Sequence, residues 1–259
     1  MTLAGFTETS FTDGGVTRAV YRRGAGPGVV IMHEIPGITP QVAAFAERVA
    51  DAGFTVFVPH LFGTPGKRFS IPYLAQQFAR ACVSREFAVM ASRGSSPITT
   101  WLRALCRHVH AELGGKGVGA LGMCLTGNFA LALMVDPVVM APVLSQPSLP
   151  FCIGRERSAG LHLSDEDLAT VKARVAAGCP VLGLRFSADP LVPGARFARL
   201  REELGAGFEA VEIDSSRGNP HGIKRIAHSV LTLDLVDREG HPTRAALERV
   251  LGFFREQLG

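Results

Sequence analysis

Short apolar runs alternate along the chain with segments whose apolar positions recur every three or four residues. Residues 28–32 (GVVIM) form a five-residue apolar run, which predicts a buried strand. The segment that follows has apolar residues at helical spacing, namely Val42, Phe45 and Val49. Residues 54–58 (FTVFV) then predict a second buried strand.

The same alternation continues to the end of the chain. Further strands are predicted at 117–121, 137–144, 181–186 and 208–213. Helices are predicted at 41–53, 100–113, 128–135, 164–175, 195–204 and 247–258. Strands that alternate with helices favour an α/β fold, with a mostly parallel central sheet and helices on both faces. Ligands of such folds bind at the carboxyl ends of the strands.

The length and composition of the chain predict one α/β domain over residues 1–259. Apolar residues make up 47% of the chain and charged residues 19%, which allows a core and excludes a disordered chain. Residues 63–97 break the alternation and are rich in Pro, Gly, Ser and Arg. We expect irregular structure or a lid over the carboxyl edge of the sheet there.

The charges and cysteines limit the partners that we expect. The net charge of +4 is scattered, without a run of five or six like charges, so neither nucleic acid nor a membrane surface is an expected partner. No apolar run reaches the roughly 18 residues of a membrane span, and the first residues lack a secretory pattern. Five sparse cysteines do not describe a disulfide scaffold, so we expect a reducing, cytoplasmic location. The oligomeric state is not predicted.

Cys124 lies in the sharpest local pattern of the chain, GALGMCLTGNFALAL, between a predicted strand and a predicted helix. Gly122 and Gly127 supply the small neighbours that a nucleophile on a strained strand-to-helix turn requires. The positive end of the helix would favour a thiolate there, and the backbone N–H of Leu125 would hold an oxyanion. The alternative is a buried cysteine that only fills space.

A thiol nucleophile needs a base and an orienting acid, and in this class of sheet they follow it in the order acid, then histidine. Asp189 comes just after one predicted strand, although an Asx-Pro turn would also explain it. His221 lies in a Gly/Pro-rich loop after the next strand. His228 is the nearest competitor, but it falls in a segment predicted to be helical. We therefore predict that Cys124, Asp189 and His221 form a triad.

Glu34 ends the first strong strand, in IMHEIPG, so its side chain is expected at the same edge of the sheet. A carboxylate near a cysteine would hold the thiol protonated until substrate displaces it. Glu34 could instead cap the following turn. The backbone N–H of Ile35 is the natural second oxyanion donor.

These residues resemble those of the dienelactone hydrolases, cysteine members of the α/β-hydrolase superfamily. The resemblance extends from the HEIPG segment to the HGIKR segment and is weakest across residues 63–97. It implies an α/β-hydrolase fold. It also implies hydrolysis of a small lactone or ester through a Cys-His-Asp triad and an acyl-enzyme, with no metal or organic cofactor.

The resemblance further implies that Glu34 pairs with the resting thiol and that arginines bind a carboxylate of the substrate. Arg225, four residues after the predicted histidine, matches one of these arginines. For the other we choose Arg85, in CVSREF, over Arg80 and Arg93.

The chain departs from the family pattern at Thr126, where glycine is usual, and at His33, where glutamine is common. These departures bear on the dienelactone substrate more than on the hydrolytic chemistry. A general carboxylesterase or thioesterase on the same triad therefore stays open, as does a non-catalytic relative that binds a small acid.

Two other patterns are set aside. Residues 117–122 fit G-x-G-x-x-G, the dinucleotide fingerprint, but the glycines fall within a predicted strand and no acid follows about 20 positions later. Cys106, His108 and His110 are spaced by two residues on a predicted helix, where side chains point in different directions, so we expect no metal there.

Overall fold

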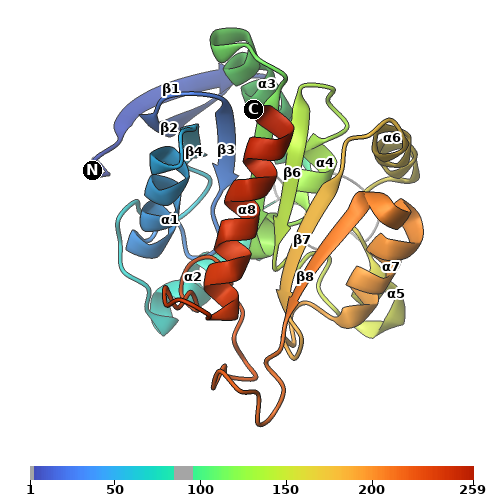
Figure 1. The fold of residues 1–259 in the computed structure, drawn as a ribbon. Coiled ribbons are helices and arrows are strands. Elements are labelled where there is room, and N and C mark those ends of the chain that lie inside the picture. The colour runs from blue at the N-terminus through green and yellow to red at the C-terminus, as the bar shows by residue number, and fades with distance from the viewer. Residues whose placement is uncertain (1–2, 85–95) are drawn as a thin grey trace.

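A sheet of eight strands runs through the middle of the molecule (Figure 1). The structure, a computed structural model, describes residues 3–84 and 96–259. The strand order is β1-β2-β4-β3-β5-β6-β7-β8. The first two strands, β1 (Thr7–Asp13) and β2 (Val16–Gly24), are antiparallel to each other, and β2 is antiparallel to β4.

The remaining six strands are parallel, as the sequence predicts. They are β3 (Gly28–Met32), β4 (Thr55–Pro59), β5 (Val118–Met123), β6 (Val139–Ser145), β7 (Val181–Phe186) and β8 (Phe208–Ile213). Every residue of β3, β4, β5 and β7 is buried. This pattern follows from helices that cover both faces of the sheet.

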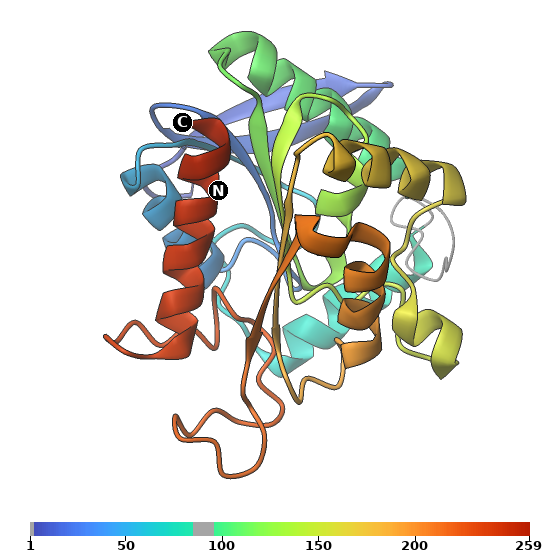
Figure 2. The ribbon, with the colours of Figure 1, turned by 45° about the vertical axis from the view of Figure 1, so that its right-hand side comes forward.

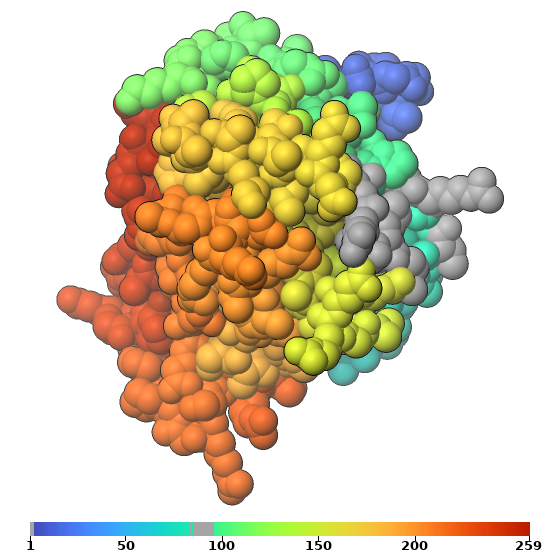
Figure 3. Space-filling view, turned by 90° about the vertical axis from the view of Figure 1, so that its right-hand side faces the viewer, coloured from blue at the N-terminus to red at the C-terminus, as the bar shows by residue number. Residues whose placement is uncertain are grey.

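The helices form one layer on each side of the sheet, which Figure 2 shows nearly edge-on. One layer consists of α1 (Pro40–Asp51) and α8 (Pro242–Leu258). The other consists of α3 (Pro97–Leu113), α4 (Phe129–Leu133), α6 (Asp165–Ala176) and α7 (Gly194–Leu204). Figure 3 shows α6 and α7 covering this second face. Two further helices, α2 (Ile71–Val83) and α5 (Gly154–Ala159), lie toward the carboxyl ends of the strands (Figure 1).

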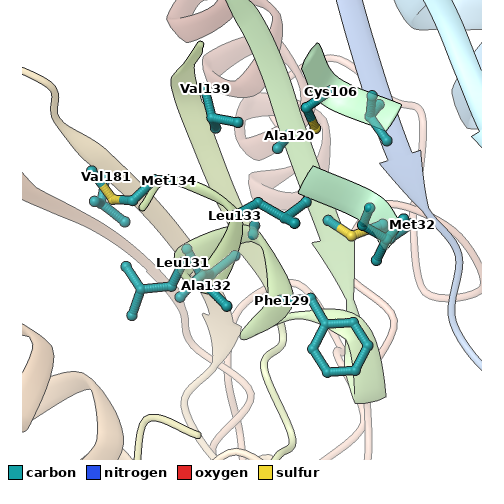
Figure 4. Close-up of a cluster of buried hydrophobic side chains, with 14 of the residues drawn as sticks. Met32, Cys106, Ala120, Phe129, Leu131, Ala132, Leu133, Met134, Val139 and Val181 are labelled. Carbon is teal, nitrogen blue, oxygen red and sulfur yellow. The ribbon is translucent and has the colours of Figure 1, made fainter. Parts of the chain in front are cut away.

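The short helix α4 is apolar at every position and fully buried, as expected for a helix enclosed on all sides. It packs in a cluster with Met32, Ala120, Val139 and Val181, one residue from each of four strands (Figure 4). Complete burial of one large apolar side chain stabilises a fold by about 1.5–3 kcal/mol. The cluster therefore fixes α4, and with it the turn that joins α4 to β5.

The structure confirms the predicted fold class and places all six predicted strands within two residues of their expected bounds. The predicted helix start at Ser164 is also confirmed, because its Oγ accepts a hydrogen bond from the N–H of Asp167 at 3.1 Å. The strands β1 and β2 were not predicted. β1 is largely exposed, and only Val20 and Tyr21 of β2 are buried, so neither strand has the continuous apolar run of the parallel strands.

Part of the expectation for residues 63–97 is wrong, because residues 71–83 form the helix α2. Its buried face carries Tyr73, Gln77 and Ala81, so a polar residue interrupts the apolar spacing that would have indicated a helix. Residues 85–95 lie outside the described part of the chain. Among the helices of the described ranges, none has the length and apolar character that a membrane crossing requires.

Candidate active site

Cys124 follows β5 directly and opens a single turn of 3-10 helix, Cys124–Thr126. Its backbone φ is 54°, in the left-handed region that residues other than glycine rarely adopt. Gly122 permits this turn, because a Cβ there would lie 2.0 Å from the carbonyl oxygen of Thr126. The structure thus places Cys124 on the strained strand-to-helix turn that the sequence predicts, with its side chain half-buried at the carboxyl edge of the sheet.

The buried side chain of Thr126 stabilises this turn through hydrogen bonds. Its hydroxyl accepts a hydrogen bond from the N–H of Met123 at 3.0 Å and reaches the carbonyl oxygen of Met32 at 2.9 Å. It therefore links the carboxyl ends of β5 and β3. The loops that start there carry Leu125 and Ile35, the two residues whose N–H groups are predicted to hold an oxyanion.

The histidine that contacts Asp189 is His228 rather than His221. Nδ1 of His228 lies 2.7 Å from Oδ2 of Asp189, whose side chain is fully buried. Asp189 follows β7 as predicted, and its Oδ1 accepts the N–H of Leu191 at 2.9 Å. The prediction of His221 as the partner is wrong. That residue is exposed, and its ring packs edge-to-face on His241, with 5.3 Å between ring centroids.

Sequence reasoning missed His228 because it assigned this residue to a helix. The segment after β8, which extends below the sheet in Figure 1, is built from turns and loops instead. The N–H groups of His228 and Ser229 donate to Oδ2 of Asp234, at 2.8 and 3.0 Å. An aspartate six residues after the histidine, capping its turn, is the local signal that could have identified it. Chain order could not, because His221 and His228 both follow Asp189.

The Asp189 contact orients the His228 ring and leaves its other nitrogen available. Nε2 is buried, and the side chain that acts on it is that of Cys124. Burial alone would lower the pKa of His228. The negative charge of the Cys124 sulfur and the bond to Asp189 outweigh burial and raise the pKa well above 6.5. Cys124, His228 and Asp189 therefore interact as one electrostatic unit.

Glu34 is buried at the end of β3, and both of its carboxylate oxygens are engaged. Oε2 accepts from the hydroxyl of Ser229 at 2.7 Å and from Nε2 of Gln146 at 3.2 Å. Oε1 accepts from the hydroxyl of Thr232. These contacts attach the segment after His228 to the sheet. None of these partners was predicted from the sequence.

The sulfur of Cys124 has a different neighbour from the one that the family resemblance implies. Its Sγ lies 3.4 Å from Oγ of Ser148, whereas the hydrogen bonds of Glu34 go to hydroxyl and amide groups. Burial raises the pKa of Glu34, although the hydrogen bonds and the charge of His228 offset part of this rise. Pairing of Glu34 with the resting thiol therefore stays a prediction without a contact to support it.

His33, the second departure from the family pattern, joins two loops at the same edge. Its Nε2 accepts the N–H of Leu61 at 3.1 Å, and its Nδ1 lies 3.1 Å from the carbonyl oxygen of Glu34. Burial lowers the pKa of His33 to about 3, so the ring is neutral. The neutral tautomer with hydrogen on Nδ1 satisfies both contacts.

The remaining predicted residues are placed as follows. Leu125 lies in the first turn of the 3-10 helix, where backbone N–H groups have no acceptor within the helix. Ile35 is buried directly after β3. Arg225 is exposed, three residues before His228. Arg85 lies outside the described residues. The roles of all four stay predictions.

The candidate metal residues on α3 do not converge. Cys106 is buried in the core, whereas His108 is exposed and stacks on Phe11 at 5.0 Å between ring centroids. Across residues 3–84 and 96–259, no group of three or more His, Cys, Asp or Glu side chains could hold a metal ion.

This protein is an α/β-hydrolase by its mostly parallel sheet, by the cysteine on a left-handed turn after β5, and by the Asp–His pair after β7 and β8. The sequence matches the Dienelactone hydrolase family over residues 17–258. The chain belongs to this family, and it is a carboxylic ester hydrolase.

Relatives and solved structures agree with this membership. A Saccharomyces cerevisiae protein named as a candidate carboxymethylenebutenolidase is 26% identical over 243 residues, which cover 93% of this chain and 82% of that protein. A structure from Klebsiella pneumoniae, named as a candidate dienelactone hydrolase, superimposes with a TM-score of 0.64 at 18% identity, covering 97% of this chain and 98% of the other. A dienelactone hydrolase from Anabaena variabilis gives a TM-score of 0.62 at 16% identity, covering 98% and 100%. At such identities the structural similarity shows the shared fold.

Proposed function

We propose that this chain hydrolyses small esters or lactones through a covalent acyl-enzyme on Cys124. The observation that supports this most is the contact of 2.7 Å between Asp189 and His228, together with the charge coupling between His228 and Cys124. An acid, a base and a thiol in this relation are the parts that nucleophilic catalysis requires.

In the first half of the reaction, Nε2 of His228 takes the thiol proton and the sulfur attacks the carbonyl carbon. The carbonyl oxygen becomes an oxyanion, held by the N–H groups of Leu125 and Ile35. The intermediate then collapses to a thioester. The C–O bond breaks, and the leaving oxygen receives the proton from His228.

In the second half, His228 removes a proton from water, and the resulting hydroxide attacks the thioester carbonyl. Collapse of this intermediate releases the acid, and the sulfur leaves with the proton returned through His228. Asp189 accepts the hydrogen bond from Nδ1 and so keeps the proton on that nitrogen, which leaves Nε2 to act as the base. With a lactone, the acid and the alcohol leave as one molecule, because the ring has opened.

Glu34 acts on this chemistry indirectly, through the residues that it holds in place. Its carboxylate holds Ser229 and Thr232, which both follow His228 closely on the chain. It thereby fixes the loop that presents the imidazole to the sulfur. Its negative charge also favours the imidazolium that forms when the thiol is deprotonated.

The substrate that we propose is small and anionic. We take Arg225, exposed three residues before His228, as the group that binds a carboxylate of the substrate. The spacing that pointed to it was counted from His221; counted from His228, the same spacing falls on Thr232, which bonds to Glu34. The name of the yeast relative indicates a butenolide, which is an unsaturated lactone. A carboxylated unsaturated lactone unites both features.

Substitution of Cys124 tests the proposal. We expect Cys124→Ala to abolish turnover of p-nitrophenyl acetate while leaving the circular dichroism spectrum unchanged. Cys152→Ala is the matched control, because Cys152 is also half-buried but donates its thiol to the carbonyl oxygen of Pro190 at 3.2 Å. Wild-type turnover in Cys124→Ala would overturn the assignment of the nucleophile.

A further inference from the structure

We propose that Ser148 is a further catalytic residue, whose hydroxyl donates a hydrogen bond to the Cys124 sulfur and stabilises its thiolate before attack. This inference rests on the proposed role of Cys124. Oγ of Ser148 lies 3.4 Å from Sγ, and Ser148 is only 3% exposed. The hydroxyl is thus a buried polar group within hydrogen-bond distance of the reacting atom, and it can donate to a thiolate there.

The backbone holds Ser148 against the nucleophile. The N–H of Ser148 donates to the carbonyl oxygen of Cys124 itself, at 3.0 Å. Gly127 lets the two segments approach closely, because a Cβ there would lie 2.5 Å from Cα of Pro147. The position of the hydroxyl relative to the sulfur is therefore set by backbone contacts and not by a flexible loop.

A buried guanidinium fixes the other side of this segment. Arg196 is fully buried and donates to the carbonyl oxygens of Pro147 at 2.6 Å, Gly160 at 2.8 Å and Pro150. Pro147 and Pro150 lie on either side of Ser148. Burial lowers the pKa of Arg196 to about 10, so the side chain is still charged at neutral pH. Its charge is solvated by the carbonyl groups of the segment that carries Ser148.

The chemistry of the donor distinguishes this arrangement from a cysteine paired with a carboxylate. A carboxylate beside a thiol favours the protonated sulfur, whereas a hydroxyl that donates to the sulfur favours the thiolate. In this chain the carboxylate of Glu34 is occupied by Ser229, Thr232 and Gln146. The Ser148 hydroxyl is therefore placed to stabilise the thiolate once His228 has taken the proton from Cys124.

Alkylation of Cys124 by iodoacetamide between pH 4 and pH 10 tests this role. The rate, followed by the mass of the peptide that contains Cys124, reports the thiolate without any ester. A hydrogen bond to a charged group changes an equilibrium constant by about tenfold or more, here that between the thiol and the thiolate of Cys124. We therefore expect Ser148→Ala to move the midpoint of the pH profile upward by about one unit. Ser148→Thr retains the hydroxyl and should restore the wild-type midpoint.

The readout separates this inference from the proposed function. A Ser148→Ala profile that superimposes on the wild-type profile, in a variant with an unchanged unfolding midpoint, would overturn the role of Ser148 even if the wild-type enzyme hydrolyses esters. Conversely, a shifted profile in a protein that turns over no ester would support Ser148 and refute the proposed function.

Discussion

Replacing the two candidate histidines separately tests the site at the point where sequence and structure disagree. His228→Gln removes the imidazole, but its amide can still donate to Oδ2 of Asp189, which the ring of His228 contacts at 2.7 Å in the wild type. The buried carboxylate therefore keeps a partner, and the fold should survive. His221→Ala removes an exposed ring whose aromatic neighbour is His241.

The size of the expected loss follows from the two roles of His228. General base catalysis by a positioned side chain contributes about 10²–10⁴-fold, or about 2.7–5.4 kcal/mol of transition-state stabilisation. The negative charge of the Cys124 sulfur is one cause of the raised pKa of His228, so the imidazolium also offsets the charge of the attacking sulfur. Because glutamine can supply neither the base nor the charge, we expect about a 10³-fold loss of kcat/KM for His228→Gln.

The assay is hydrolysis of p-nitrophenyl acetate at pH 7, with circular dichroism to verify folding of each variant. His221→Ala should stay within about twofold of the wild type, as expected of an exposed side chain outside the chemistry. The opposite order of effects, with His221→Ala inactive and His228→Gln near the wild-type rate, would refute the assignment of the base.

Three further predictions concern Thr126, Glu34 and Arg225. Thr126→Val should lower the free energy of unfolding by about 1–3 kcal/mol in urea titrations, because it leaves the N–H of a buried backbone group without its acceptor; an equal loss in Thr126→Ser would contradict this reason. Burial raises the pKa of Glu34 above its ordinary value of 4.5. As the pH rises, this carboxyl group therefore ionises in the unfolded chain before it ionises in the folded one, and the folded protein loses stability between the two pKa values. Relative to Glu34→Gln, the wild type should therefore lose unfolding free energy from pH 4 to pH 8, and a constant difference would argue against it. Arg225→Ala should raise KM for anionic esters by about fivefold with neutral esters unaffected, since an exposed ion pair is worth up to about 1 kcal/mol; equal losses on both would exclude a role in binding the carboxylate.

Most of the fold could be predicted from the sequence because four of the six parallel strands are buried at every position. Such strands appear as continuous apolar runs, and all six were placed closely. The strands β1 and β2, in which few residues are fully buried, give no such run. The helix α2 was missed for a related reason, because Gln77 occupies a position on its buried face.

The same difference between local and distant contacts decides which residues of the candidate site could be predicted. Cys124 was found because the turn needs glycines beside it in the sequence, and Asp189 because it follows a strand. The histidine depends on how the segment after β8 folds, which is decided by Asp234 capping the turn and by Glu34, 195 residues from Ser229, holding it. Contacts over such separations leave no periodic pattern in the chain.

An acyl group on Cys124 is the direct consequence of the proposed reaction. Wild-type protein should be mixed with excess p-nitrophenyl acetate, quenched in acid within the first turnovers, and examined by intact mass and peptide mapping. We expect one acetyl group per chain, carried by Cys124 and lost once the ester is consumed. Turnover with unmodified Cys124, or with the acetyl group on another residue, would contradict the covalent mechanism.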